Sequence, residues 1–390
     1  MLHQERANWL AVVSLAVSTF ASVTTEFLPI GLLTDIAAGL HVSEGSAGLM
    51  VTMPGLVAAL TGPALIVAAG RIDRRALLLA LSAMLVGSNV LAALAQNLPT
   101  MLIARVMLGI VVGGFWTFAP GATANLVPPA MQPRAMSYVL AGISVATVAG
   151  IPAGAMLGNL AGWRAAFIAS AVLAATVLAL QLRILPAMPA ARAIVPRDLL
   201  APLTDRGTRL VLAVALLMMS GHFVAYTYLR PTLQQVFGLD AGTVTMLLLV
   251  YGLAGLAGTF LGGQFVLRSV KGAALAAAVL IAAVLLLAAV RGHGAVAATV
   301  SVLAWGGAFG LVPVALSTWM QRAAGEAPEA GQALLVTFFQ IAIACGAFIG
   351  GIVVDARGVG SALLLGSVLA AMAAVSIGFG KEPASAARQT

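Results

Sequence analysis

Long apolar stretches dominate this chain, and short polar segments separate them. A helix needs roughly 20 apolar residues to span a hydrocarbon core about 30 Å thick. About twelve runs meet this length, near 8–30, 45–68, 76–95, 99–120, 134–157, 164–184, 208–229, 242–266, 272–290, 295–319, 331–354 and 359–380. The pattern therefore predicts an all-α membrane protein with about twelve transmembrane helices.

Composition and charge exclude a soluble protein and a nucleic-acid-binding protein. Of the 390 residues, 61% are hydrophobic and 8% are charged, whereas a soluble domain carries about 25% charged residues. The net charge of +8 does not indicate nucleic acid as a partner, because the basic residues lie singly or in small groups between the apolar runs. The single cysteine, Cys345, and four scattered histidines predict neither a disulfide framework nor a metal site. We expect no cofactor.

The basic residues predict the orientation in the membrane. Of the 20 Lys and Arg residues, fifteen fall in one set of alternate loops and four in the other, and Arg105 lies inside a predicted span. Cytoplasmic loops carry the excess of Lys and Arg. Both termini and the central loop are therefore expected to be cytoplasmic.

The longest polar break, 186–209, contains four prolines and divides the chain almost in half. It predicts an N-terminal six-helix bundle over 1–185, a cytoplasmic loop over 186–207 and a C-terminal bundle with a short cytoplasmic tail over 208–390. The halves also resemble copies, because 150–167 aligns with 346–363 at an offset of 196 and 71–74 aligns with 268–271 at an offset of 197. Such a duplication supports alternating access about a central site.

Two charged residues inside predicted spans are candidates for proton coupling, because charge is costly in a membrane. Glu26 shares a helix face with Thr19 and Ser22, and Arg105 lies about six residues into the fourth helix at a similar depth. A pair between them would make both charges tolerable. Either Glu26 exchanges protons with Arg105 as its partner, or the two form a static pair that fixes helix packing.

The seventh helix carries His222, Tyr226 and Arg230 on one face. His222 is a third candidate for proton coupling, or it contacts substrate, because histidine changes charge near neutral pH; a neutral imidazole bonded to a neighbouring helix is the alternative. Arg230 is either a cavity ligand or a charge that reaches the membrane surface. Aromatic residues could stack on a substrate or serve packing alone. The candidate substrate cavity comprises Thr19, Ser22, Trp116, Tyr226, Arg230, Trp305, Phe309 and Gln340.

Two further segments are candidate gating motifs, and a third concerns proton coupling. The loop Gly70-Arg71-Ile72-Asp73-Arg74-Arg75 resembles, in altered form, a signature of the major facilitator superfamily, with Gly70 at the usual acidic position and Asp73 at the usual glycine. The segment Gly150-Ile151-Pro152-Ala153-Gly154, followed by Gly162-Trp163-Arg164, resembles the fifth-helix motif of its antiporters. The segment Arg105-Val106-Met107-Leu108-Gly109 resembles the motif whose arginine is tied to proton coupling. Small residues along the fifth helix also permit close helix contact.

These motifs resemble the drug:proton antiporter branch of the superfamily over nearly the whole chain. The segment 26–33 and the seventh helix are most similar to bacterial sugar (arabinose-type), purine ribonucleoside and chloramphenicol efflux transporters. The resemblance implies a protein of the bacterial inner membrane that exports a small molecule, such as a sugar, a nucleoside or a drug, in exchange for protons. We expect a monomer, because two six-helix halves can enclose the path within one chain. A proton symporter or uniporter for uptake is the first alternative, and a membrane sensor or scaffold is the second. No nucleophile–base pair or metal spacing predicts an enzyme.

Overall fold

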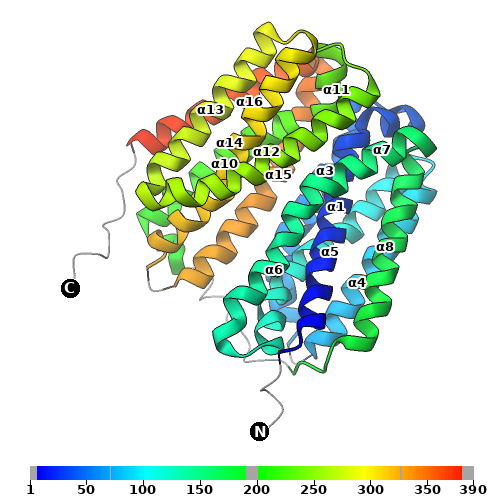
Figure 1. Ribbon diagram of the computed structural model, residues 1–390, viewed down its shortest axis with the longest axis vertical. Coiled ribbons are helices and arrows are strands. Elements are labelled where there is room, and N and C mark those ends of the chain that lie inside the picture. The colour runs from blue at the N-terminus through cyan, green and yellow to red at the C-terminus, as the bar shows by residue number, and fades with distance from the viewer. Residues whose placement is uncertain (1–6, 71, 190–200, 326, 380–390) are drawn as a thin grey trace. The chain divides into compact units, whose positions relative to one another are not determined.

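The computed structural model describes residues 7–70, 72–189, 201–325 and 327–379 (Figure 1). Among these residues, twelve helices are long and apolar enough to cross a membrane, and there is no strand. The prediction of an all-α protein with twelve spans is confirmed. Contacts divide the chain into two units, residues 1–43 with 49–194 and residues 44–48 with 195–390.

The first unit is a bundle of helices from the N-terminal half of the chain. They are α1 (Trp9–Leu40), α3 (Leu49–Ala68), α4 (Arg74–Leu94), α5 (Leu98–Leu126), α6 (Gln132–Val145), α7 (Ile151–Ala161) and α8 (Trp163–Ile184). A 3-10 turn, Pro129–Met131, precedes α6, and a π-helical turn, Ala146–Gly150, joins α6 to α7. Helix α3 packs on α5, α4 packs on α8, and α1 packs on α6.

The second unit repeats this arrangement with helices from the other half of the chain. They are α10 (Arg206–Tyr226), α11 (Leu229–Pro231), α12 (Ala241–Arg268), α13 (Val270–Arg291), α14 (Gly294–Ala323), α15 (Pro328–Arg357) and α16 (Val359–Phe379). A 3-10 turn, Ala201–Thr204, precedes α10, and a π-helical turn, Thr232–Val236, follows α11. Helix α12 packs on α14, α10 packs on α15, and α13 packs on α16.

The short helix α2 (Glu44–Ala47) groups with the second unit because it binds to α15. The N–H of Gly45 donates to Oδ1 of Asp355 at 2.9 Å. A side chain at Gly45 would collide with the carbonyl oxygen of Gly351, so only glycine permits this approach. The amide of Gln235 also donates to Glu44 at 3.0 Å.

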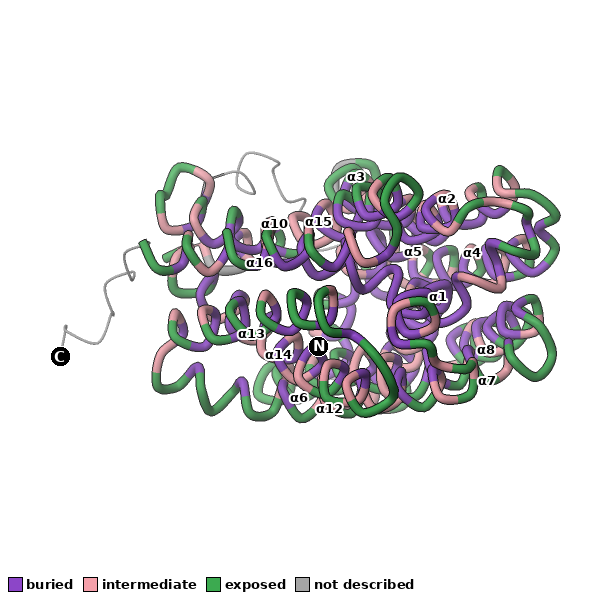
Figure 2. The backbone as a smooth tube through the Cα atoms, turned by 90° about the horizontal axis from the view of Figure 1, so that it is seen from above, coloured by how far each residue is buried: buried purple, intermediate pink, exposed green. Residues whose placement is uncertain are grey.

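Apolar side chains cover the exposed sides of the helices as well as their buried sides. Leu160 is 78% exposed and Leu267 is 83% exposed, although both are large and hydrophobic. Figure 2 shows buried and exposed positions alternating along single helices, α8 and α13 among them. Helices that are apolar all round suit a lipid environment.

Three helix boundaries recur at a spacing of 196 positions in the two units. Gly162 and Gly358 both adopt positive φ, 81° and 80°, a conformation that glycine reaches without steric cost. The recurring pairs are Asp73 and Ser269 at the starts of α4 and α13, Asn97 and His293 at the starts of α5 and α14, and Gly162 and Gly358 at the starts of α8 and α16. The predicted duplication is therefore visible in the backbone.

Close helix contacts recur at the same spacing. In the first unit, a Cβ added at Gly150 or Gly154 would meet a side chain of α1. In the second unit, a Cβ added at Gly346 or Gly350 would meet the backbone of α10. The contacts pair Gly150 with Thr24, Gly154 with Leu28, Gly346 with Ser220, and Gly350 with Val224. Small residues thus bring the corresponding helices together in both units.

The glycine contacts at Gly350 and Gly154 differ in how far the neighbouring atoms can move, and this difference leads to a prediction about stability. A Cβ at Gly350 would lie 2.6 Å from the backbone oxygen of Val224, whereas a Cβ at Gly154 meets only the flexible end of Leu28. Overpacking costs about 1–3 kcal/mol when the neighbours cannot move. We expect Gly350→Ala to lower the thermal unfolding midpoint of detergent-solubilised protein more than Gly154→Ala does. Equal effects would contradict this interpretation.

Candidate functional site

A proline in α1 creates the acceptor that holds Arg105. Pro29 has no N–H, so it cannot bond to the carbonyl oxygen of Thr25 four residues earlier. Nη1 of Arg105 on α5 donates to that oxygen at 2.8 Å. The guanidinium also lies over the ring of Phe167 on α8, 4.9 Å from its centroid. Arg105 thus joins three helices of the first unit.

Glu26 lies in the same buried region as Arg105. Glu26 is 4% exposed and Arg105 is completely buried, and the charge of Glu26 acts on the guanidinium. Nε and Nη2 of Arg105 have no hydrogen-bond partner within the part of the chain that the structure describes. Arg105 therefore keeps donors that a carboxylate or a ligand can take.

Sequence reasoning missed the polar residue that braces this site. Asn89 on α4 is fully buried, and its Nδ2 donates to Oγ1 of Thr25 at 3.2 Å and to the Leu85 carbonyl at 3.0 Å. Thr25 thus bonds to α4 through its hydroxyl and to α5 through its carbonyl. An asparagine inside an apolar span was the available signal, since polar groups there are costly.

The second unit gathers aromatic side chains around His222 on α10. The ring of Phe309 on α14 stacks on the imidazole with centroids 3.6 Å apart, and Tyr226 stacks on it at 4.8 Å. Trp305 stands edge-on to the imidazole at 5.6 Å. Tyr251 on α12, which sequence reasoning missed, stacks on Tyr226 at 4.8 Å. We call these five residues the aromatic cluster.

A hydrogen bond fixes the proton on His222. Nε1 of Trp305 donates to Nδ1 of His222 at 3.1 Å. Because the indole N–H only donates, Nδ1 must carry a lone pair, and the neutral ring then holds its proton on Nε2. A charged imidazolium would set two donors against each other. Proton coupling at His222 stays a prediction, and it requires this bond to break first.

Glu26 and His222 occupy corresponding positions of the two units. They lie 196 residues apart in helices whose glycine contacts, Gly150 on Thr24 and Gly346 on Ser220, repeat at that spacing. The same place in the fold therefore carries a carboxylate beside an arginine in one unit. In the other unit it carries a neutral imidazole among aromatic rings.

The remaining candidate cavity residues are divided between the two units. Thr19 is buried against Gly142 of α6, and its hydroxyl donates to the Leu15 carbonyl at 3.1 Å. Arg230 on α11 is 2% exposed. Ser22 is buried, while Trp116 and Gln340 are half-buried. Their role in a substrate cavity stays a prediction.

The loop before α4 bonds to the segment that follows α8. Oδ1 of Asp73 accepts from the N–H groups of Arg75 at 2.8 Å and of Met188 at 2.9 Å. The N–H of Arg74 donates to the Met188 carbonyl at 2.9 Å. Arg71 lies outside the described residues. Asp73 therefore caps a helix and holds the segment after α8, and gating by Asp73 and Arg74 stays a prediction.

The fifth-helix motif has a local defect in its hydrogen bonds. Before Pro152 the helix passes through the π-helical turn Ala146–Gly150, where the N–H of Ile151 bonds five residues back to Ala146. Because Pro152 lacks an N–H, the backbone ladder is weaker here. Gly150 and Gly154 pack on α1, so this motif sets helix contact, and a gating role stays a prediction.

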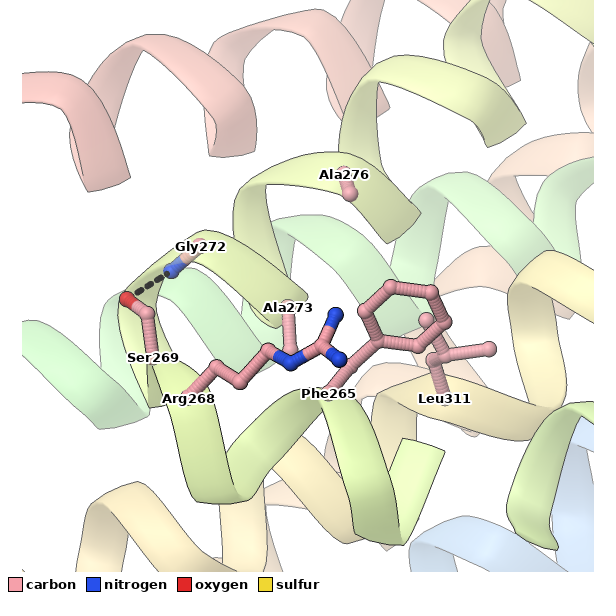
Figure 3. Close-up of a pocket in the computed structure, with 7 residues that line it drawn as sticks. All are labelled: Phe265, Arg268, Ser269, Gly272, Ala273, Ala276 and Leu311. Atoms are coloured by element: carbon pink, nitrogen blue, oxygen red, sulfur yellow. Dashed lines mark hydrogen bonds between the residues drawn. The ribbon is translucent and has the colours of Figure 1, made fainter. Parts of the chain in front are cut away.

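A small pocket of about 200 Å³ lies elsewhere in the second unit (Figure 3). In that view Arg268 extends from α12 toward Phe265, and Ser269 bonds to the N–H of Gly272. The lining also includes Ala273, Ala276 and Leu311. None of the predicted site residues lines it, so it is not the candidate site.

A family model described as Major Facilitator Superfamily matches residues 15–334. The chain belongs to the major facilitator superfamily. The purine ribonucleoside efflux pumps NepI of Escherichia coli strain K12 and Salmonella enteritidis PT4 (strain P125109) are 33% and 32% identical to it over 372 residues, which is 95% of this chain and 94% of each relative. The motif-based resemblance is confirmed.

Solved structures agree on the fold of this superfamily member. One is a bacterial homolog to the human lysosomal transporter Spinster, in an inward-facing and unoccupied conformation. It superimposes with a TM-score of 0.76 at 16% identity and covers 95% of this chain and 96% of that one. Membership of this superfamily, together with the efflux-pump relatives, makes the protein a multi-pass membrane transporter of small molecules and not an enzyme.

The double role of Asp73 in this transporter leads to a testable prediction. Asp73→Ala removes the acceptor for the Arg75 and Met188 N–H groups, and loss of such a cap costs about 0.5–2 kcal/mol. We expect faster hydrogen exchange at both amides. Asp240→Ala is the matched control, because Asp240 bonds only within the first turn of its own helix. An unchanged rate of hydrogen exchange at the Met188 N–H would contradict the role of Asp73 in holding the segment after α8.

Proposed function

We propose that this transporter exports purine ribonucleosides or related small neutral molecules in exchange for protons, by alternating access. The identity of 32–33% with purine ribonucleoside efflux pumps over 95% of the chain supports export and the substrate class. Bacterial relatives and the distribution of Lys and Arg favour the inner membrane with cytoplasmic termini. No cofactor is required, since the proton gradient supplies the energy.

The observation that carries proton coupling is the burial of Glu26 beside Arg105. In low dielectric a carboxylate keeps its charge only next to a partner, and protonation removes the cost of that charge. Arg105 stays anchored to the Thr25 carbonyl in either case. Glu26 can therefore gain or lose a proton while the arginine remains held in place.

Coupling follows if proton binding and substrate binding affect each other's affinity. A proton on Glu26 weakens its interaction with Arg105, and substrate binding on the cytoplasmic side then favours release of that proton. One proton moving down 100 mV yields about 2.3 kcal/mol, which supports a substrate gradient of nearly fiftyfold. One proton per substrate is therefore enough for useful export.

Proton release tests this proposal directly. We expect adenosine or inosine added to purified, detergent-solubilised protein to release protons, and Glu26→Gln to abolish the release. In vesicles with an imposed pH gradient, the same variant should reduce pH-driven nucleoside transport to background. Glu26→Gln with full pH-driven transport would exclude this carboxylate as the carrier.

Asp35→Asn is the matched comparison, because Asp35 is the other carboxylate in α1 and is half-buried. If transport depends on Asp35 and not on Glu26, Asp35 is the proton carrier. Substrate and proton movement in the same direction would instead favour the proton symporter, and transport without a pH effect would favour the uniporter.

A further inference from the structure

The aromatic cluster keeps two polar atoms without partners. Nε2 of His222 and the hydroxyl of Tyr251 have no hydrogen-bond partner among the residues that the structure describes. Both side chains are buried, at 0% and 5% exposure. An unsatisfied buried polar group costs free energy, so its presence calls for an explanation, such as a partner in another state.

Phe309 is the most exposed member of the cluster. It is half-buried, whereas His222, Tyr226, Tyr251 and Trp305 are buried. Its ring lies nearly parallel to the imidazole, at 10° and 3.6 Å, so it occupies one stacking face of His222.

The backbone of α14 is weakened at Phe309. Pro313 lies four residues later inside the helix and cannot donate to the carbonyl oxygen of Phe309. Helices bend most readily at such positions. A change in α14 that moves Phe309 away from His222 therefore breaks fewer hydrogen bonds than it would elsewhere in the helix.

We propose that the aromatic cluster binds the purine base of the substrate, and that the Phe309 ring occupies the place of the base when the site is empty. This inference rests on the proposed nucleoside specificity. A base is a planar ring that stacks on aromatic side chains, so it can replace Phe309 on the imidazole face. A sugar without a base has no such surface.

The hydroxyl of Tyr251 defines how the base is read. It donates or accepts, so it suits both the oxygen at position 6 of inosine and the amino group of adenosine. A base stacked on the face of the imidazole does not reach Nε2–H, which points outward in the plane of the ring. Trp305 is a positioning residue, because its hydrogen bond to Nδ1 holds the imidazole in place beneath the base.

Binding of adenosine and inosine to purified protein, followed by tryptophan fluorescence, tests the site. Losing one hydrogen bond weakens binding by about threefold to tenfold, so we expect this loss for Tyr251→Phe with both nucleosides. Phe309→Ala removes the competing ring and should tighten binding by a similar factor. The affinity for arabinose, a sugar without a base, should be the same in wild type and in Phe309→Ala.

Matched controls are Tyr138→Phe and Phe260→Ala, whose rings are 43% and 72% exposed and lie outside the cluster. Neither should change binding. If wild type binds the nucleosides but Tyr251→Phe and Phe309→Ala bind them equally well, the base site is wrong and the proposed export stands. If wild type binds neither nucleoside, the base site and the substrate class both fall. Should Phe309→Ala fail to fold, Tyr251→Phe decides.

Discussion

The hydrogen bond from Arg105 to the Thr25 carbonyl is the interaction on which the first unit depends. A buried arginine is costly without an acceptor, and a helix rarely offers one because its carbonyls are already bonded. Pro29 removes the competing donor and leaves one oxygen free in the middle of α1. The cation is thereby fixed one residue away from Glu26, so a titratable carboxylate can lie inside the bundle with its partner already in position.

The two units share their packing but not their chemistry. Glycine contacts, helix caps and positive-φ junctions recur 196 residues apart, because these features set how closely helices approach and where they end. The side chains at the corresponding positions 26 and 222 have diverged completely. A duplicated fold can therefore assign proton exchange to one copy and substrate recognition to the other without altering the contacts that hold either together.

The sequence predicted the features that depend on composition and on local spacing. Apolar runs gave twelve spans, and charges inside them gave Glu26 and Arg105. It did not predict that Asn89 braces Thr25, or that Tyr251 joins the aromatic cluster, because these contacts depend on which helix faces meet. The role of Asp73 was also missed, since the Met188 N–H that it accepts lies 115 residues away in the chain. Contacts between distant helices have no periodic signal in a single sequence.

Prolines provide a common device that the two units use in opposite ways. In α1 the carbonyl that Pro29 leaves free is taken by Arg105, so the helix gains a link to α5 at the point where its own ladder is broken. In α14 a similar defect, at Phe309 and Pro313, lies beside a half-buried ring. The carbonyl freed in α1 is bonded by the Arg105 guanidinium. The carbonyl freed in α14 belongs to Phe309 itself, so the backbone that carries this ring bends more readily. Proton exchange needs a partner that stays in place, whereas entry of a substrate needs a side chain that moves, and the two helices differ in this respect.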